Sequence, residues 1–268
     1  MSLSRFDGIN ALITGGATGI GFGLARALGR AGARIAVAST NRDRIDRAVL
    51  ALKSEGIRAL GLQLDVGDSN QWSAAADAVE KELGPLGFLA LNAGVAPPPA
   101  TVSDTPLSVW EWSLQVNLWG VIRGLHCCLP RMRAHGQPAH VLITSSIAAF
   151  NPRPTMGAYV AAKAGVVQIA EVLHAELQGT PLGVSVLAPA AVNTDIVATS
   201  KGHTPVGNEE GYAAIDAVLS KGMDPLVVAE FALARIREDQ FYIFTHREQR
   251  SAIERRFSEV LSAMGESD

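Results

Sequence analysis

The sequence predicts a single-domain α/β protein in which helices cover both faces of a seven-stranded parallel sheet. Apolar runs rich in Val, Ile, Leu and Ala alternate with helical patterns along the whole chain. Continuous apolar strands separated by helices are typical of a parallel sheet that is buried on both sides. The 268 residues suffice for one large domain. Because no repeat or polar linker divides them, we expect the domain to span residues 1–268.

Seven short apolar segments are the expected strands: Ile9–Thr14, Arg34–Ser39, Ile57–Leu64, Gly87–Leu91, Ala139–Thr144, Gly183–Ala188 and Phe241–Thr245. Helical patterns lie between them, over Gly19–Ala31, Asp43–Glu55, a stretch that Asp68 or Ser69 can cap, a long stretch from Pro106, Thr155–Leu177, Pro225–Arg237 and Arg247–Met264. Pro106 suits a first helical turn. A Pro-rich loop (Val95–Thr105) and an irregular segment (Val192–Met223) remain. Doubly wound folds bind ligands beyond the carboxyl ends of their strands, so residues 192–224 are a candidate substrate lid.

Composition excludes several classes of partner. The net charge is −3, the isoelectric point is about 6.1 and there is no block of Lys and Arg, so neither nucleic acid nor an anionic membrane is expected. No apolar run reaches about 18 residues, and Arg5 and Asp7 interrupt the N-terminal segment, which favours a cytoplasmic protein. Cys127 and Cys128 adjoin within a helical pattern and suit packing. His126, His140 and His174 form no metal set, and we expect no metal.

A glycine-rich turn, Thr14-Gly15-Gly16-Ala17-Thr18-Gly19-Ile20-Gly21, directly follows the first strand. Its glycines allow a tight turn and a close approach of a pyrophosphate, which then lies at the N-terminus of the next helix. A turn of this kind can also be a plain tight connection. Its place between a strand and a helix favours a dinucleotide site of the Rossmann fold, with Gly15, Thr18, Gly19, Ile20 and Gly21 as binding residues.

Tyr159 and Lys163 stand four positions apart in a helical run. That spacing places both side chains on one helix face, about 5–6 Å apart at Cβ. A neighbouring ammonium favours the phenolate, so we expect the pKa of Tyr159 to fall below its usual value of about 10. Such a group can exchange protons at neutral pH. The spacing alone also fits an ordinary solvated helix.

Together these motifs resemble the short-chain dehydrogenase/reductase family, classical type, over nearly the whole chain. The matching residues are Thr14, Gly15, Gly19 and Gly21 in the glycine turn, Asn92-Ala93-Gly94 after the fourth strand, Asn117 in the long helix, Ser146, Tyr159 and Lys163. The resemblance implies an NAD(P)-dependent alcohol dehydrogenase or ketoreductase.

The resemblance also implies a role for each catalytic residue. Tyr159 exchanges a proton with the substrate oxygen, and Ser146 hydrogen-bonds that oxygen. Lys163 lowers the pKa of Tyr159 and reaches the nicotinamide ribose. Asn117 holds a water through its main-chain carbonyl in a locally distorted helix. Alternatives remain open: Ser145 for the serine role, an Asx turn for Asn92 and a simple helix kink for Asn117.

The end of the second strand bears on the choice of cofactor. Ser39 stands where NAD-binding folds usually have an acid. Ser39, Thr40, Asn41 and Arg42 can receive a 2′-phosphate, so NADP is favoured over NAD. Asp43, close by, is expected to cap the next helix.

The resemblance assigns further cofactor contacts to Asp65, Val66, Asn92, Gly94, Pro189, Val192 and Thr194, besides Tyr159 and Lys163. A strand-end structural role remains open for Asp65. Ala190 replaces the glycine that usually follows Pro189, which leaves the placement of the nicotinamide open.

The substrate is expected to contact Ala148–Met156, the Pro-rich loop and the lid. Candidate contacts, each of which could instead be a core residue, are Phe150, Met156, Val197, Trp110, Trp119 and His203. Because no Lys or Arg cluster awaits an anion, a neutral, fairly hydrophobic alcohol or ketone is expected. The stretches Pro130-Arg131-Met132, Gly183–Val186 and the tail from Phe241 to Asp268 resemble a bacterial branch of the family. That branch includes dehydrogenases of benzylic alcohols in aryl ethers, so an aryl substrate is one hypothesis.

A homodimer or homotetramer is expected. The long helix and the helix of Tyr159 have more apolar residues than one sheet face needs, namely Trp112, Leu114, Leu118, Val166, Val167 and Val172. Two other classes remain open: a non-catalytic nucleotide-sensing protein, and an epimerase or dehydratase that holds its cofactor permanently.

Overall fold

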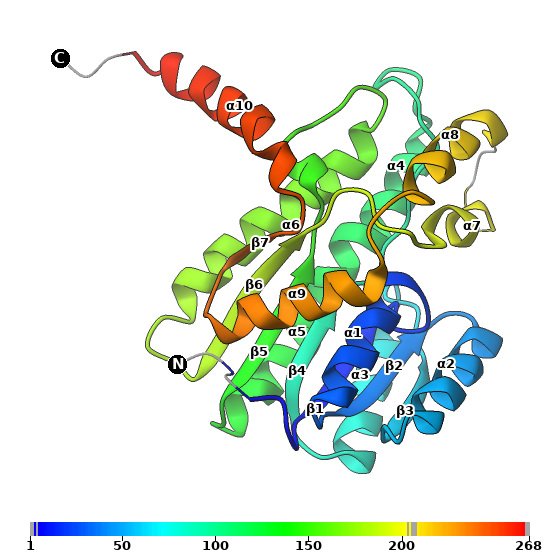
Figure 1. The fold of residues 1–268 in the computed structure, drawn as a ribbon, viewed down its shortest axis with the longest axis vertical. Helices are drawn as coiled ribbons and strands as arrows, with labels where there is room; N and C mark the ends of the chain where they lie inside the picture. Colours follow the sequence, from blue (N-terminus) through cyan, green and yellow to red (C-terminus); the bar gives the residue numbers. More distant parts are fainter. Residues whose placement is uncertain (1–2, 4, 203, 205–207, 266–268) are drawn as a thin grey trace.

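A computed structural model describes residues 3, 5–202, 204 and 208–265. Within this part of the chain seven parallel strands form one sheet in the order β3-β2-β1-β4-β5-β6-β7 (Figure 1). The strands are β1 (Asn10–Thr14), β2 (Arg34–Ser39), β3 (Ala59–Gln63), β4 (Leu86–Leu91), β5 (Ala139–Thr144), β6 (Leu182–Ala188) and β7 (Tyr242–Phe244). The order reverses direction between β1 and β4, which opens a crevice at the carboxyl ends of these strands. The predicted fold is confirmed.

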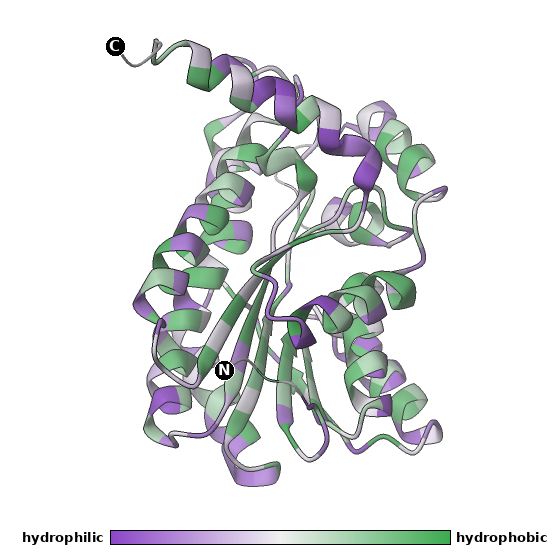
Figure 2. Ribbon diagram, turned by 60° about the vertical axis from the view of Figure 1, so that its left-hand side comes forward, coloured by the Kyte–Doolittle hydropathy of each residue, from purple (hydrophilic) through white to green (hydrophobic). Residues whose placement is uncertain are grey.

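Helices cover both faces of the sheet. On one face lie α1 (Gly19–Arg30), α2 (Arg42–Ser54) and α9 (Pro225–Arg237), and on the other lie α3 (Ser69–Glu82), α5 (Gly120–Ala134) and α6 (Gly157–Glu176). Side chains of a strand alternate between the two cores, as Leu12 and Ile13 of β1 do. Green predominates along the central strands in Figure 2, while the helices show both colours.

The segment after β6 differs from the prediction. Residues 192–223 were expected to be irregular, but they contain α7 (Ile196–Lys201) and α8 (Glu209–Leu219) (Figure 1). The side chain of Asn208 accepts a hydrogen bond from the amide of Gly211 and so caps α8. Glu209 and Glu210 follow in the first turn, where negative charge favours a helix.

The expected long helix from Pro106 is interrupted. It consists of α4 (Leu107–Leu114), a π-helical turn η1 (Gln115–Trp119) and α5. The amide of Gly120 donates to the carbonyl of Gln115, five residues earlier, as a π turn requires. The local distortion that the resemblance implied at Asn117 is therefore present.

The C-terminal segment forms a 3₁₀ turn η3 (Arg247–Gln249) and then α10 (Arg250–Ser262), which projects from the body of the molecule (Figures 1 and 2). No residue of α10 is buried, and Phe257, Val260 and Leu261 are exposed. Val166 and Val167, expected to add apolar surface to α6, are instead buried in the protein's own core.

Candidate active site

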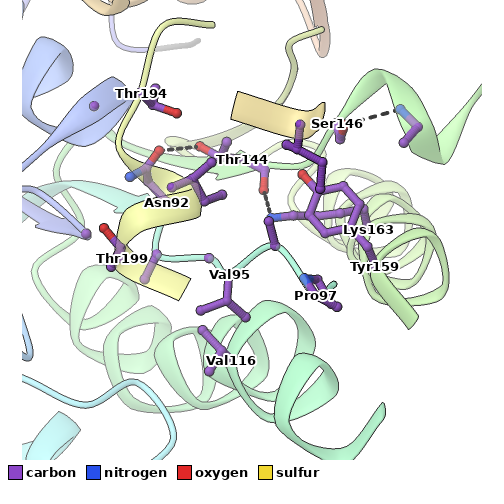
Figure 3. A pocket seen from close by; sticks show the side chains of 18 of the residues that line it. Asn92, Val95, Pro97, Val116, Thr144, Ser146, Tyr159, Lys163, Thr194 and Thr199 are labelled. Carbon is purple, nitrogen blue, oxygen red and sulfur yellow. Dashed lines mark hydrogen bonds between the residues drawn. The ribbon is translucent and has the colours of Figure 1, made fainter. Parts of the chain in front are cut away.

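A large cavity lies at the carboxyl ends of the strands. Its volume is about 1430 Å³, and its walls come from the glycine turn, the segments that follow β2 to β6, and the helices α7 and α8. Sites for a single small ligand usually measure about 300–1,000 Å³. The cavity therefore has room for a dinucleotide and a substrate together. Figure 3 shows part of its lining.

The glycine turn forms one end of this cavity. Gly15 and Gly19 have φ angles of 63° and 53°, in the left-handed region that glycine adopts without steric cost. Gly21 lies behind the loop, since a Cβ there would come within 2.2 Å of the carbonyl oxygen of Gly15. Gly15, Thr18, Gly19 and Ile20 line the cavity, as predicted, whereas Gly21 serves the packing of α1 against the turn.

Ser146, Tyr159 and Lys163 meet at the centre of the cavity wall (Figure 3). Tyr159 and Lys163 lie one turn apart on α6, with the Lys163 Nζ 5.8 Å from the centre of the Tyr159 ring. Ser146 precedes the 3₁₀ turn η2 (Ile147–Ala149), and its Oγ accepts a hydrogen bond of 3.2 Å from the amide of Ala148. Ser146 also hydrogen-bonds the Tyr159 hydroxyl. The three predicted catalytic side chains are thus brought together.

The electrostatics of Tyr159 and Lys163 differ from the expectation. Burial raises the pKa of Tyr159, and the hydrogen bond to Ser146 only partly offsets this effect. Burial also lowers the pKa of Lys163 to about 8. The expected acidification of Tyr159 by Lys163 is therefore wrong for this structure. The physical reason is that the Lys163 Nζ donates to the carbonyl of Thr144 at 2.9 Å, while the phenol is desolvated.

Asn117 is fully buried in the π turn η1. Its Oδ1 accepts from the amide of Val95 at 3.0 Å, and its Nδ2 donates to the Val95 carbonyl at 3.0 Å and to the Ser113 Oγ at 3.2 Å. The side chain thereby fixes the loop that follows β4. Gly94 is required in this loop because a Cβ there would stand 2.8 Å from the Asn117 Oδ1 and 3.4 Å from the Lys163 Nζ.

Asn92 connects three strand ends beneath the cavity. Its amide donates to the Thr14 Oγ1 at 2.9 Å, its Nδ2 donates to the Thr14 carbonyl at 3.1 Å, and its Oδ1 accepts from the Thr144 Oγ1 at 3.2 Å (Figure 3). Ser145, the competing serine, donates its hydroxyl to the carbonyl of Lys163 at 2.8 Å. That bond uses the Ser145 hydroxyl within the core, which favours Ser146 for the serine role.

At the end of β2 the structure separates the predicted residues. Ser39 and Thr40 line the cavity, but Asn41 and Arg42 are not part of its lining. The Asn41 side chain caps α2 by accepting from the amide of Arg44 at 2.9 Å. Arg42 instead forms an exposed ion pair of 3.0 Å with Asp46.

Arg44 is a cavity residue that the sequence analysis missed. Its Nη1 donates to the Thr199 Oγ1 at 2.7 Å, so it connects α2 with α7. The N-cap at Asn41 sets the phase of α2, and a capping prediction at Asn41 would have identified Arg44.

Asp65 and Val66, after β3, line the same end of the cavity. The Asp65 Oδ1 accepts from the amide of Gly67 at 2.8 Å. This is the turn-forming role that the sequence left open for Asp65, and it leaves the second carboxylate oxygen outside that turn. Gln63, which was not predicted, also lines the cavity, and its Nε2 donates to the carbonyl of Thr40 at 3.2 Å.

Pro189, Val192 and Thr194 also line the cavity, and Thr194 lies against the glycine turn, since a Cβ on Gly19 would come within 3.0 Å of its Cγ2. The amide of Ala190 donates to the Nδ1 of His246 at 3.3 Å, and Val192 pairs with Met223 in a parallel bridge. The turn after β6 is thus held from two sides despite the alanine at position 190.

All three segments expected to contact the substrate, 148–156, the Pro-rich loop and 192–223, contribute to the cavity lining, but of the side chains named singly only Met156 does so within the described residues. Phe150 and Val197 are buried elsewhere, Trp110 packs near Gly157, and Trp119 is exposed beside Arg123. His203 lies outside the described residues. Further apolar residues line the cavity: Trp112 and Val116, which the sequence did not assign to the substrate, and Ile215, Val218 and Leu219 of the expected lid segment.

The fold and these motifs agree with comparisons to known proteins. A family model for short chain dehydrogenases matches residues 10–204. The chain belongs to the short-chain dehydrogenase family. This short-chain dehydrogenase is 33% identical over 267 residues to C alpha-dehydrogenase of Sphingobium sp. (strain NBRC 103272 / SYK-6), covering 96% of the chain and 88% of that relative.

Further relatives of this short-chain dehydrogenase are also oxidoreductases. It is 29% identical to 1-deoxy-11-beta-hydroxypentalenate dehydrogenase of Streptomyces exfoliatus, covering 93% of the chain and 87% of that relative. A short-chain dehydrogenase/reductase from Burkholderia phymatum, solved in complex with NAD, matches with a TM-score of 0.92 and 28% identity, covering 98% of both chains. The chain is therefore an oxidoreductase of this family, and a nicotinamide cofactor is supported.

The cavity of this short-chain dehydrogenase fits such a cofactor. Thr18, at the N-cap of α1, makes no side-chain capping bond, so the first amides of α1 are available to a pyrophosphate. The close approach of backbone at Gly15 and Gly21 leaves no space for larger residues. Among the described residues no group of His, Cys, Asp and Glu could hold a metal ion. In the described part of the chain, no helix is both long and apolar enough to span a membrane.

Proposed function

We propose that this short-chain dehydrogenase interconverts a hydrophobic secondary alcohol and the corresponding ketone, with NADP as the preferred cofactor. The observation that carries the proposal is the meeting of Ser146, Tyr159 and Lys163 in the cavity that the glycine turn also lines. A non-catalytic nucleotide-sensing protein has no use for this arrangement of a phenol, a hydroxyl and an ammonium.

In the direction of reduction, Tyr159 donates its proton to the substrate oxygen while the Ser146 hydroxyl donates a hydrogen bond to the same atom. The bound nicotinamide supplies the hydride. Burial of Tyr159 keeps the phenol protonated, which suits a proton donor. The protein contributes position and preorganised hydrogen bonds.

Lys163 has two roles in this proposal. Its Nζ is anchored on the carbonyl of Thr144, close to the Tyr159 ring. When Tyr159 loses its proton, the ammonium stabilises the phenolate, because an opposite charge acts strongly in a desolvated site. It is also placed to contact the ribose of the nicotinamide. The main-chain carbonyl of Asn117, in the π turn, holds the water that connects Lys163 to solvent.

The proposed preference for NADP rests on the end of β2. Ser39 and Thr40 line the cavity there, and Arg44 supplies the guanidinium that the sequence analysis expected from Arg42. No carboxylate stands at this strand end, where it would repel a 2′-phosphate. Hydroxyls with one guanidinium form a suitable phosphate site.

The proposed substrate class rests on the apolar lining contributed by Trp112, Met156 and α8. The similarity to C alpha-dehydrogenase supports an aryl alcohol or ketone. Residues 192–224, in their described part, form the proposed lid over this half of the cavity.

We further propose a homodimer or homotetramer. The exposed apolar residues of α10 and the half-exposed Leu114 and Leu118 support this assembly. A cytoplasmic location stays a prediction from the sequence.

The decisive experiment follows nicotinamide absorbance with a panel of aryl and alkyl ketones and secondary alcohols, using NADPH, NADH and their oxidised forms. Tyr159→Phe removes the proton donor and keeps the ring, so it should abolish turnover while the affinity for the cofactor is retained. Turnover that survives in Tyr159→Phe would refute the proposed mechanism. Binding of the cofactor by the variant, measured by fluorescence titration, is the control for a folded site.

A further inference from the structure

We propose that Arg153 binds a carboxylate on the far end of the substrate. The preferred substrates are then hydrophobic alcohols or ketones with a negative charge remote from the reacting carbon. This inference rests on the proposed function and narrows its substrate class, since the sequence alone predicts a wholly neutral substrate.

The charges around the cavity are unevenly distributed. In the described lining, the carboxylates are Asp65 and Asp68, both just after β3 at the adenosine end. The cations are Arg44, Lys163 and Arg153. Arg44 is bonded to Thr199 and Lys163 to a main-chain carbonyl, whereas Arg153 has no hydrogen-bond or ion-pair partner among the described residues. Because Arg44 stands at the end where the 2′-phosphate is proposed to bind and Lys163 stands beside Tyr159, Arg153 is the lining cation that is available to an anionic group of the substrate.

The loop that carries Arg153 has restricted flexibility. The loop connects η2 with α6. Ser146 directly precedes η2, and Tyr159 lies in the first turn of α6. Prolines at positions 152 and 154 flank Arg153 and fix the local φ angles. Thr155 has a φ angle of 66°, which is rare for a β-branched residue and is typical of functional sites.

The Pro-rich loop holds this strained conformation in place. The amide of Ala100 donates to the carbonyl of Thr155 at 3.1 Å, and Ala100 pairs with Met156 in a parallel bridge. The guanidinium is thus attached to a backbone that is fixed relative to the catalytic pair. The fixed backbone lowers the conformational entropy that is lost on binding, while the side chain of Arg153 is itself exposed and free to reach a ligand.

The other residues that line the part of the cavity near Arg153 indicate that the ligand is amphipathic. Trp112, Met156 and Leu219 provide apolar walls, while the amides of Asn151 and Gln249 add neutral polar groups to the lining. An apolar body fits these walls, and a carboxylate matches the planar fork of a guanidinium, which binds it with two parallel hydrogen bonds.

Arg153→Gln tests the proposal with two matched ketones, 4-acetylbenzoate and 4-acetylbenzamide, at saturating NADPH. For the wild type, we expect a lower KM for the carboxylate than for the amide. Arg153→Gln should raise the KM of the carboxylate about tenfold, as the loss of one charge-assisted interaction implies. The KM of the amide should change less than about twofold, because neither of its hydrogen-bonding groups needs a cation. Arg153→Lys should restore part of the difference, because it keeps the charge and loses the planar fork.

Arg133→Gln is the matched control. Arg133 is an exposed arginine in the last turn of α5, it has no side-chain partner among the described residues, and it does not line the cavity. Arg133→Gln removes the same charge as Arg153→Gln, so a general electrostatic effect on KM would appear in both variants. We expect no change in either KM for Arg133→Gln.

Two results would overturn the proposal: equal KM values for both ketones that Arg153→Gln leaves unchanged, or an equal rise of both KM values in that variant. If neither ketone is turned over by the wild type, nor any other ketone of the panel, the proposed function fails. Calorimetric binding of 4-acetylbenzoate to the enzyme with NADP then still decides the role of Arg153. Affinity that drops in Arg153→Gln supports the proposal, and affinity that is absent or unchanged refutes it.

Discussion

Replacing Lys163 by Met should stabilise the protein while it abolishes turnover. Lys163 is 4% exposed, and burial lowers its pKa from 10.5 to about 8. Holding the ammonium in this site therefore costs free energy of folding, and methionine occupies a similar volume without a charge. The substitution also removes the ammonium that is proposed to stabilise the Tyr159 phenolate, and so it should abolish turnover.

The expected gain follows from the difference between the two pKa values. Each pKa unit corresponds to about 1.4 kcal/mol, so the buried ammonium costs about 3 kcal/mol at neutral pH. The variant also loses the hydrogen bond of 2.9 Å to the carbonyl of Thr144, which is worth about 1 kcal/mol. We expect Lys163→Met to raise the free energy of unfolding by about 2 kcal/mol.

The dependence on pH distinguishes this explanation from a simple packing effect. The folded-state pKa of Lys163 is depressed to about 8, so between about pH 8 and 10.5 the unfolded chain holds more protons than the folded protein. Wild-type stability therefore rises relative to the variant across this window. The advantage of Lys163→Met should be largest at pH 7 and largely disappear by pH 10.5.

Urea unfolding at pH 7 and at pH 10, followed by circular dichroism, measures both effects. Lys53→Met, at an exposed position in the last turn of α2, is the control and should change stability little at either pH. The reasoning is refuted if Lys163→Met is less stable than the wild type at pH 7, or if its advantage is the same at both pH values.

Three further predictions concern the cofactor site, the core and the loop after β4. Arg44→Leu should raise the KM for NADPH about tenfold with little effect on that for NADH; steady-state kinetics that give an unchanged ratio would contradict the 2′-phosphate role. His140, whose pKa burial lowers to about 4, should make the protein lose stability as the pH falls from about 6.5 to about 4, because the unfolded chain then binds a proton that the folded protein excludes. His140→Gln should flatten this part of the melting temperature profile, and an identical profile would argue against it. Gly94→Ala should lower kcat roughly 10- to 100-fold, because the added Cβ displaces Asn117 and the Lys163 amine. A kcat close to that of the wild type would contradict this prediction.

Residues whose place depends on strand ends were predictable from the sequence. Thr14, Asn92 and Thr144 follow or end apolar strands, and the parallel sheet brings these ends together whatever the details of packing. Ser146, which the family resemblance singled out, also follows a strand end, that of β5. Continuous apolar runs were sufficient to locate the strands because the strands of this sheet are covered on both faces.

Features that depend on helix phase or on short helices were not predictable in the same way. Arg42 and Arg44 are the same residue type two positions apart, and only the point at which α2 begins, at Asn41, decides which of them faces the cavity. The helix α8 lies in a segment rich in Gly, Thr and Pro, where its capping residue Asn208 was the one clear signal. The raised pKa of Tyr159 depends on the burial of its side chain in the folded protein, which no spacing along the sequence can show.

The π turn at Gln115–Trp119 makes this site vulnerable to a change that would look harmless in the helix itself. A chain lacking one residue there could continue from α4 to α5 as regular α-helix, with better hydrogen-bond geometry. The deletion would also rotate everything before it by about 100° relative to α5, turning Asn117 away from Val95. A relative that lacks one residue at this point would therefore keep the fold and gain a regular helix, but it would lack catalytic activity.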